Sequence, residues 1–184
     1  MKKILLINGS PREKGNTRSL SEAFITRSLQ RGNIVKKYNI FDYDIKDCID
    51  CGKCFEDNVP CVIEDDFNKL AEELVEADII VFSLPVYFYS IPGHMKNFID
   101  RLHCFSVGNK NISGKEYAII SCCAKDDMST FDGVRMPLEK TAEKFGWTLL
   151  DEILAPNMKE EGAIDNTDGI NRVRDLADRI IWVS

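Results

Sequence analysis

Four cysteines lie close together in the first third of the chain. Three of them form a Cys-x2-Cys-x2-Cys run, and a fourth follows six residues later, directly after a proline: Cys48, Cys51, Cys54 and Cys61. In a reducing compartment, clustered thiols are more often metal ligands or redox groups than disulfides. The seven residue steps between the third and fourth cysteines span roughly 23 Å when extended. The loop can therefore fold back and bring the four sulfurs together.

Three chemistries fit this run of cysteines. Bacterial ferredoxins share its first spacings, although their fourth cysteine comes after three residues and precedes a proline. Structural zinc usually takes two well-separated cysteine pairs, so three cysteines in one run favour a [4Fe-4S] cluster over zinc. Bare redox-active thiols are the third alternative. Gly52 eases the tight backbone path that closely spaced ligands require.

A polar, glycine-containing stretch over residues 9–19 follows the first apolar run of the chain. It directly precedes a predicted helix, whose first N–H groups and positive dipole end favour a phosphate. A Walker A loop needs Lys and Ser/Thr directly after Gly15, and a dinucleotide fingerprint needs glycines where Pro11 and Lys14 stand. A phosphomonoester such as that of FMN is the best candidate, and an ordinary polar loop is the alternative. The candidate phosphate ligands are Ser10, Arg12, Asn16, Thr17 and Arg18.

A second candidate segment, residues 84–93, follows the third apolar run and carries Tyr87, Phe88 and Tyr89 in succession. Aromatic side chains can form a wall for a planar ring, and stacking is worth about 0.5–1.5 kcal/mol beyond the buried area. Taken alone, such aromatics more often pack in a core or an interface. Together with a phosphate loop, they indicate half of a flavin site.

Elements of alternating type must position these segments. Short apolar runs, typical of strands covered on both faces, alternate with stretches of helical pattern. A helix that ends near Val75 has Asp65 or Asp66 as its candidate N-cap. The predicted strands are residues 3–7, 35–40, 79–84, 117–122 and 149–154, and the predicted helices are 16–30, 66–75, 92–105, a helix ending at 145, and 166–182.

This alternation predicts an α/β protein, with one parallel sheet and helices on both of its faces. For five strands the commoner order is 2-1-3-4-5, the flavodoxin-like arrangement, and its ligand crevice lies beyond the carboxyl ends of strands 1 and 3. Both candidate segments fall at that crevice. No linker or repeat divides the chain, so residues 1–184 are expected to form a single domain with a cysteine-rich loop at 48–61.

Composition excludes several classes of function. The net charge is −6 and the sequence pI is about 5.0, which gives nucleic-acid binding no electrostatic support. No apolar run approaches the roughly 18 residues that suggest a membrane span, and the apolar stretch at the N-terminus is too short for a signal peptide. A cytoplasmic protein that binds neither membrane nor nucleic acid is therefore expected.

The two candidate segments together resemble the NADPH-dependent FMN reductase family. The resemblance rests on three stretches that occur jointly: Ile7-Asn8-Gly9-Ser10-Pro11-Arg12 with Gly15-Asn16-Thr17, Pro85-Val86-Tyr87, and Met95 to Arg101. It covers roughly the first hundred residues strongly. The compact cysteine run is similar to that of the iron–sulfur flavoprotein branch of this family, in which a [4Fe-4S] cluster accompanies FMN.

The resemblance implies a role for particular residues. Ser10, Arg12, Asn16 and Thr17 would hold the FMN phosphate, and Pro85, Val86, Tyr87 and Phe88 would border the isoalloxazine ring. The loop after the fourth strand would hold the other edge of the flavin, through Ser121 and Cys122, although this chain lacks the glycines that the family often has there. The resemblance to this family also implies a homodimer or a homotetramer.

Three classes of function are compatible with this interpretation. The first is an FMN-dependent oxidoreductase that receives electrons from NAD(P)H or a ferredoxin-like donor and reduces a small-molecule acceptor, with a [4Fe-4S] relay if the cluster forms. The second is a non-catalytic FMN electron carrier or redox sensor with bare thiols. A binding module that holds zinc and no flavin is a third. No side-chain acid or base is required, and none is nominated.

Overall fold

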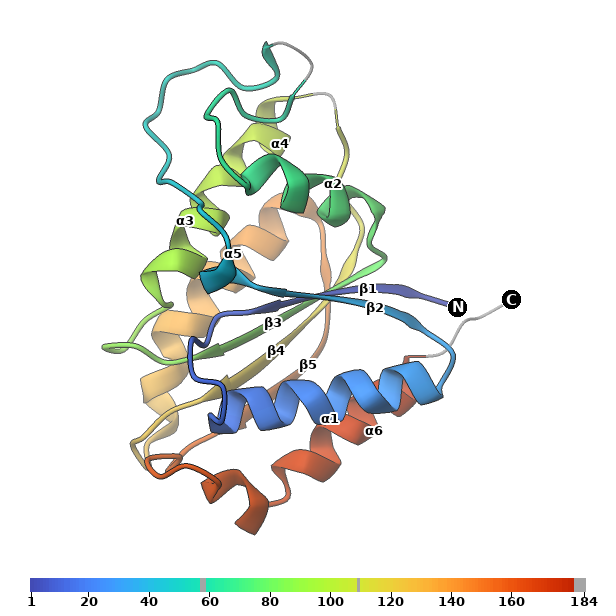
Figure 1. Ribbon diagram of the computed structural model, residues 1–184, viewed down its shortest axis with the longest axis vertical. Coiled ribbons are helices and arrows are strands. Elements are labelled where there is room, and N and C mark those ends of the chain that lie inside the picture. Colours follow the sequence, from blue (N-terminus) through green and yellow to red (C-terminus); the bar gives the residue numbers. More distant parts are fainter. Residues whose placement is uncertain (57–58, 109, 181–184) are drawn as a thin grey trace.

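The computed structural model describes residues 1–56, 59–108 and 110–180. Five parallel strands form one sheet in the order β2-β1-β3-β4-β5 (Figure 1). This confirms the α/β class and the flavodoxin-like strand order predicted from the sequence. The strands are β1 (Lys3–Asn8), β2 (Ile34–Asn39), β3 (Ile79–Pro85), β4 (Glu116–Cys122) and β5 (Thr148–Ala155).

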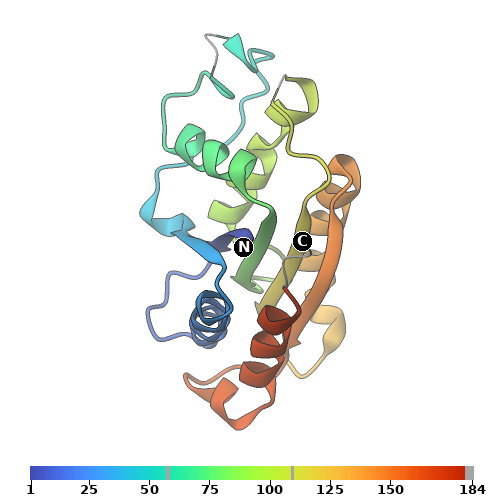
Figure 2. The ribbon, with the colours of Figure 1, turned by 90° about the vertical axis from the view of Figure 1, so that its right-hand side faces the viewer.

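Helices cover both faces of the sheet, as Figures 1 and 2 show. On one face α1 (Asn16–Gln30) and α6 (Gly169–Arg179) pack side by side. The other face carries α2 (Phe67–Glu76), α3 (Gly93–Arg101), α4 (His103–Val107) and α5 (Asp132–Phe145). A separate hydrophobic cluster fills each side, with Phe24 and Leu176 in the first and Phe67 and Phe98 in the second.

β3 lies at the centre of the sheet, and six of its seven residues are buried. Its side chains enter both hydrophobic clusters, Val81 on the α1/α6 side and Phe82 on the α2–α5 side. A strand covered on both faces explains why its sequence is a nearly continuous apolar run rather than an alternating one.

The expected boundaries differ from the observed ones at two helices. The helix expected over 92–105 is divided into α3 and α4. At the division, the Leu102 N–H donates to the Ile99 carbonyl and the Phe105 N–H donates to the Leu102 carbonyl. These i-to-i+3 bonds tighten the turn and redirect the axis. The last helix begins at Gly169 rather than 166, after a short 3-10 turn, and Trp182 lies outside the described residues. In the part of the chain that the structure describes, no helix has the length and apolarity needed to cross a bilayer.

Candidate cofactor site and cysteine loop

A cavity of about 330 Å³ lies at the carboxyl ends of β1, β3 and β4. This is the crevice that the strand order predicts, and its volume falls at the lower end of the range for ligand pockets. The phosphate-loop candidates form one wall, and the segments after β3, β4 and β5 form the rest. The lining residues are Ser10, Arg12, Gly15, Asn16, Thr17, Pro85, Val86, Tyr87, Cys122, Cys123, Ala124, Met158 and Lys159.

The N-terminus of α1 opens into this cavity without a cap. Gly15 occupies the N-cap position with an extended backbone, it makes no side-chain capping bond, and the first turn contains no acidic residue. A Cβ atom on Gly15 would stand 3.2 Å from the Cβ of Arg12, so the loop is tightly closed there. The Ser10 hydroxyl accepts a hydrogen bond from the Arg12 N–H at 3.3 Å. Within the part of the chain that the structure describes, the first N–H groups of α1 thus remain free to bind an anion.

Asn16 holds the loop after β5 with its side chain. Its amide nitrogen donates to the carbonyl oxygens of Met158 (3.3 Å) and Glu160 (2.8 Å), and its amide oxygen accepts the N–H of Ile164 (3.2 Å). The side chain is therefore fully engaged within the protein, which leaves the main-chain N–H as the group that Asn16 offers to the cavity. Arg18, the other charged candidate, is not among the lining residues and its Nε lies 3.8 Å from Glu22.

The segment after β3 turns back sharply at the cavity wall. Tyr87 and Ser90 exchange two main-chain hydrogen bonds of 2.9 and 3.0 Å, and the intervening Phe88 and Tyr89 both have positive φ. Such a conformation costs non-glycine residues about 1–3 kcal/mol each and is concentrated at functional sites. Tyr87 lines the cavity together with Pro85 and Val86, whereas Phe88 is 97% exposed and lies outside the lining. The projecting turn is visible between β3 and α3 in Figure 1.

Two neighbours support this turn. Lys125 contacts the hydroxyl of Tyr89 and lies 4.6 Å from the centre of its ring. On the other side, a Cβ atom on Gly133 would come within 1.8 Å of the Tyr89 carbonyl oxygen, so α5 approaches the turn as closely as a glycine allows. The turn is therefore held in place by packing.

The end of β4 contributes two cysteines with different surroundings. Burial raises the pKa of Cys122 to about 12, against a smaller opposing effect of a hydrogen bond with Thr17. The Cys123 thiol donates to the Lys125 carbonyl at 3.2 Å. Ser121 is fully buried, its hydroxyl has no partner in the described part of the chain, and it does not line the cavity.

Sequence reasoning missed the loop after β5, which supplies Met158 and Lys159 to the cavity. Neither residue belongs to a recognisable motif. The predicted parallel sheet nevertheless contained the signal, because the carboxyl ends of all its strands meet at one edge.

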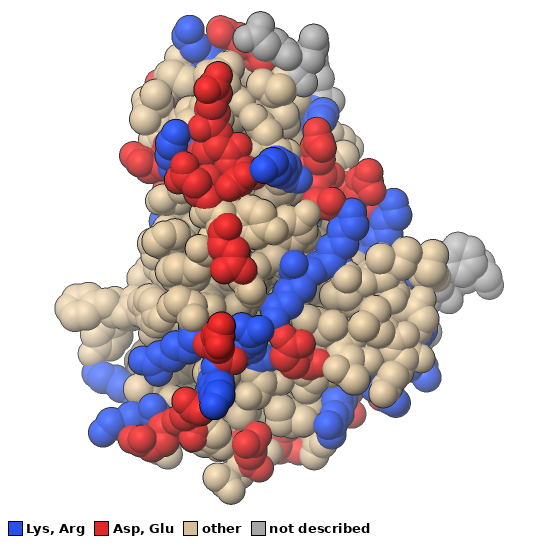
Figure 3. Space-filling model, viewed as in Figure 1, with Lys and Arg blue, Asp and Glu red and all other residues tan. Residues whose placement is uncertain are grey.

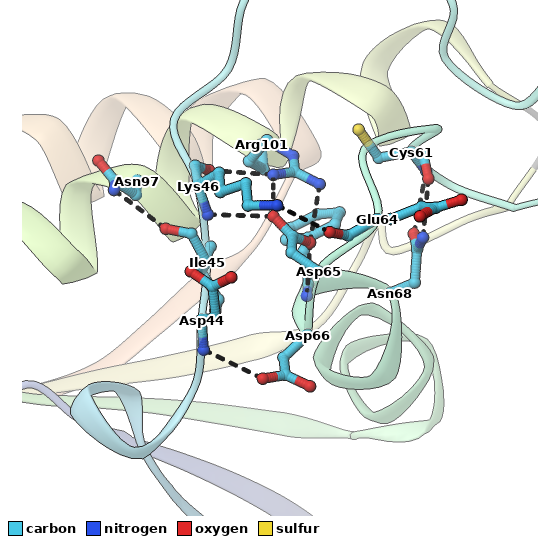
Figure 4. Close-up of polar contacts among 11 residues, drawn as sticks. Asp44, Ile45, Lys46, Cys61, Glu64, Asp65, Asp66, Asn68, Asn97 and Arg101 are labelled. Carbon is cyan, nitrogen blue, oxygen red and sulfur yellow. Dashed lines mark hydrogen bonds and ion pairs between the residues drawn. The ribbon is translucent and has the colours of Figure 1, made fainter.

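The cysteine loop begins and ends at a narrow neck, shown in Figure 4. The Asp66 N–H donates to the Asp44 carbonyl at 2.9 Å, and the Asp44 N–H donates to the Asp66 carboxylate at 3.0 Å. Next to them the Lys46 N–H donates to the Asp65 carboxylate at 3.0 Å. These bonds hold the two chain segments of the neck together.

The four cysteines of the loop differ in exposure: Cys48 and Cys51 are exposed, Cys54 is half-buried and Cys61 is buried. Burial raises the pKa of Cys54, and the charges of Cys61, Cys48 and Cys51 raise it further, so each of these three cysteines lies within electrostatic reach of Cys54. Within residues 1–56, 59–108 and 110–180, however, no three Cys, His, Asp or Glu side chains gather as tightly as a single metal ion requires.

The backbone of the loop is tightly curved and anchored. Gly52 has a φ of +69°, as its place between closely spaced cysteines predicts, and Asp50 and Phe55 also have positive φ. The Phe55 ring packs so closely on the end of α4 that a Cβ on Gly108 would lie 1.9 Å from it. Phe55 also meets Phe105 edge-on, with ring centres 6.2 Å apart.

The loop and the cavity lie in different parts of one chain. Figures 1 and 2 both place the loop beyond α2 and α4, far from the N-terminus of α1. None of the four cysteines of the loop lines the cavity. Acidic side chains surround the loop, including the exposed Asp47, Asp50, Glu56 and Glu64, and Figure 3 shows acidic groups gathered over this upper region.

A family model described as NADPH-dependent FMN reductase matches residues 2–130. Among related proteins, an iron-sulfur flavoprotein of Archaeoglobus fulgidus is 36% identical over 116 residues, which cover 63% of this chain and 56% of that protein. An iron-sulfur flavoprotein of Methanosarcina thermophila is 32% identical over 99 residues, covering 54% of this chain and 51% of the relative. The chain thus matches about half the length of these relatives.

Solved structures of the same fold include an azoreductase from Bacillus anthracis, with a TM-score of 0.75 and 17% identity over 98% of this chain and all of that one. An NAD(P)H:quinone oxidoreductase from Methanothermobacter marburgensis has a TM-score of 0.73 and 13% identity, and the match covers 100% of this chain and 98% of the other. At these identities the likeness is one of fold.

Proposed function

The chain belongs to the NADPH-dependent FMN reductase family, and from this premise we propose that it is an FMN-containing oxidoreductase that uses NAD(P)H to reduce a small-molecule acceptor. The observation that carries the proposal is the uncapped N-terminus of α1, which opens into the cavity at the carboxyl edge of the sheet. When bound, FMN supplies the hydride and electron transfer, so the tasks of the protein are to bind, orient and shield it.

The cavity wall at α1 suits the phosphate end of FMN. The free N–H groups of the first turn, the Thr17 hydroxyl and the Arg12 guanidinium are donors that a phosphate can accept, and the helix dipole adds positive potential. With a pKa near 12, the neighbouring Cys122 thiol keeps its proton at neutral pH. It therefore places no negative charge beside the phosphate.

The opposite wall suits the ring end. Pro85, Val86 and Tyr87 offer apolar and aromatic surface, and Met158 adds a flexible apolar side chain from the loop after β5. The turn that carries Tyr87 packs closely against Gly133 of α5, which fixes the backbone beside the ring-contacting surface. Rigid placement reduces the entropy cost of binding.

For the cysteine loop we propose that Cys48, Cys51, Cys54 and Cys61 are the ligands of a [4Fe-4S] cluster. The donor set consists of thiols alone, and relatives that match this chain carry the name iron-sulfur flavoprotein. Four sulfurs around one zinc ion lie roughly 3.8 Å apart, as a Zn–S distance of about 2.3 Å requires, whereas a four-iron cube holds its ligands farther apart. Three closely spaced thiols in one run, with a fourth within electrostatic reach of Cys54, fit a four-iron group better than a single zinc ion.

The separation of loop and cavity bears on the assembly. A cluster on this loop stands apart from the cavity of its own chain, so electron transfer between the cluster and FMN would need a neighbouring copy of the chain. A homodimer or homotetramer that places the loop of one subunit against the cavity of another would supply this neighbour. The match to the NADPH-dependent FMN reductase family favours NAD(P)H over a ferredoxin-like protein as the electron source.

The test is an anaerobic purification followed by a visible spectrum, a fluorometric FMN assay and steady-state oxidation of NAD(P)H with a quinone acceptor. We expect about one FMN per chain and sustained turnover. FMN without turnover would instead support the non-catalytic carrier, and failure to bind FMN would overturn both.

The cluster is tested separately by iron and sulfide analysis after anaerobic reconstitution. We expect about four irons per chain with matching sulfide, and a lower content after any Cys→Ser change among the four loop cysteines. The matched control is C123S, because Cys123 is a buried thiol that lines the cavity and lies away from the loop, whereas Cys104 of α4 lies within electrostatic reach of Cys54 and Cys61. One zinc per chain, or no metal at all, would contradict the cluster.

A further inference from the structure

A buried ion pair joins α3 to the base of the cysteine loop. Arg101 donates from Nη1 and Nη2 to the two carboxylate oxygens of Asp65, at 2.7 and 3.2 Å, and the side chains are 1% and 0% exposed. The guanidinium also lies 4.5 Å from the centre of the Phe67 ring. Burying such a pair costs several kcal/mol per ion, roughly, and adds little stability beyond that of an apolar replacement. Stability is therefore a weak explanation for this pair, and its contacts with the loop neck offer another.

The same pair ties down both chain segments of the loop neck. Arg101 Nη1 donates to the Lys46 carbonyl at 3.0 Å, and the Asp65 carboxylate accepts the Lys46 N–H. Residues on either side of the four cysteines are thus fixed to one guanidinium, as Figure 4 shows.

One donor of Arg101 is left over. Its Nε–H is buried and has no hydrogen-bond partner in the described part of the chain. Cys61 turns its sulfur toward the guanidinium (Figure 4). An unsatisfied buried donor on a cation is costly, and an anionic sulfur group at Cys61 would satisfy it.

The main chain of Cys61 is fixed independently by Asn68. The amide oxygen of Asn68 accepts the Cys61 N–H at 3.0 Å, and its amide nitrogen donates to the Cys61 carbonyl at 2.7 Å. The fourth cysteine is consequently held in place, while Cys48 and Cys51 remain exposed.

We propose that Arg101 is a positioning residue for a cluster on this loop: it presents a fixed positive charge and a free N–H to the Cys61 side of the site, while Asn68 fixes the Cys61 main chain. This inference rests on the proposed [4Fe-4S] site. Outer-shell groups of this kind orient the ligands of a metal site and tune how tightly the metal is retained and the reduction potential of the site. A positive charge stabilises the more negative, reduced form of a cluster, so Arg101 should raise its reduction potential.

The test compares three variants of the full chain after anaerobic reconstitution. R101Q removes the charge, N68A releases the Cys61 main chain, and K96Q is the matched control. Lys96 lies on α3 like Arg101, but its half-exposed ammonium pairs with Asp100 at 2.5 Å. Iron and sulfide content, loss of iron to a chelator, and the potential from a spectroscopically monitored redox titration are measured.

Cluster affinity should fall about 10- to 100-fold in R101Q and N68A. The potential should fall only in R101Q, since N68A leaves the charge in place, and K96Q should match wild type in both. If wild type takes up no iron and sulfide, the cluster itself fails and this inference falls with it. If wild type holds four irons and R101Q behaves like K96Q, the role of Arg101 is overturned while the cluster stands.

R101K replaces R101Q if the latter does not fold, as judged by circular dichroism. It retains the charge but loses the forked geometry that binds Asp65 and Lys46 together. The inference then requires weaker iron retention at a potential close to that of wild type. Retention equal to wild type in R101K would contradict it.

Discussion

Replacing Arg12 with Gln should weaken FMN binding about tenfold, while the same change at Arg18 should leave it nearly unchanged. The two arginines lie six residues apart at the junction of the loop and α1, so each change removes one positive charge from the same region. Only Arg12 lines the cavity, whereas the Arg18 Nε is directed to Glu22 at 3.8 Å. The pair of variants therefore separates a direct contact from a general charge effect.

The magnitude follows from the exposure of Arg12. A hydrogen bond to a charged group contributes roughly 1.5–3 kcal/mol, and the lower end applies because Arg12 is exposed and screened by solvent. A loss of about 1.4 kcal/mol corresponds to a tenfold change in Kd. The Arg12 effect should shrink as salt is added, since screening weakens the contact in wild type.

The assay is quenching of flavin fluorescence as apoprotein is titrated into FMN, repeated with riboflavin, which lacks the phosphate. R12Q should bind riboflavin as wild type does. An equal loss for FMN and riboflavin would show that Arg12 does not contact the phosphate. An equal loss of FMN affinity in R12Q and R18Q would show that both arginines act only through long-range charge. That result would refute the placement of the FMN phosphate at the α1 end of the cavity.

Three further predictions concern other parts of the molecule. Replacing Tyr87 with Ala should shift the reduction potential or the fluorescence of bound FMN, because Tyr87 is the aromatic side chain in the cavity wall; a spectrum and potential identical to wild type would argue against ring contact. Iodoacetamide at pH 8 should alkylate the exposed Cys48 and Cys51 of the metal-free loop and spare Cys122, whose pKa near 12 leaves it protonated. Peptide mass spectrometry measures the labelling, and faster alkylation of Cys122 than of Cys48 and Cys51 would contradict the prediction. G133A should lower the free energy of unfolding by about 1–3 kcal/mol in urea titrations, because the new Cβ would lie 1.8 Å from the Tyr89 carbonyl oxygen. G93A is the control, because a Cβ on Gly93 would have no atom within 4 Å. Equal stabilities of the two variants would show that the turn moves away from the new methyl group at no cost.

Periodicity, together with the commoner strand order of five-stranded parallel sheets, was sufficient for the architecture. The predicted strands and the order 2-1-3-4-5 are confirmed, and the helix over residues 16–30 agrees with α1 at both ends. Buried parallel strands have to be nearly continuous apolar runs, and right-handed crossovers leave few strand orders. The site at the carboxyl ends of β1 and β3 followed from that order, because a switch point is a property of topology.

Which side chains enter the cavity was decided by tertiary contacts. Asn16 has the right chemistry for a phosphate ligand, yet its amide is bound to the loop after β5, far away in the sequence. Phe88 and Tyr87 are neighbours of similar type, but the backbone turn directs one into solvent and the other into the wall. Residue type does not determine direction where the backbone adopts positive φ.

In the cysteine loop, too, the sequence indicates the chemistry and the tertiary contacts decide which residues surround it. Spacing was enough to mark four thiols as a metal or redox group, because the chemistry of a ligand set depends on its atoms. The Asn68 amide, which holds the fourth cysteine, comes from the first turn of α2, and the buried Arg101–Asp65 pair joins α3 to the segment just before α2. Nothing in their local sequence distinguishes them from ordinary helix charges and caps. Only folding brings a guanidinium from residue 101 beneath a sulfur at residue 61, because contacts between distant segments are set by how the helices pack on the sheet.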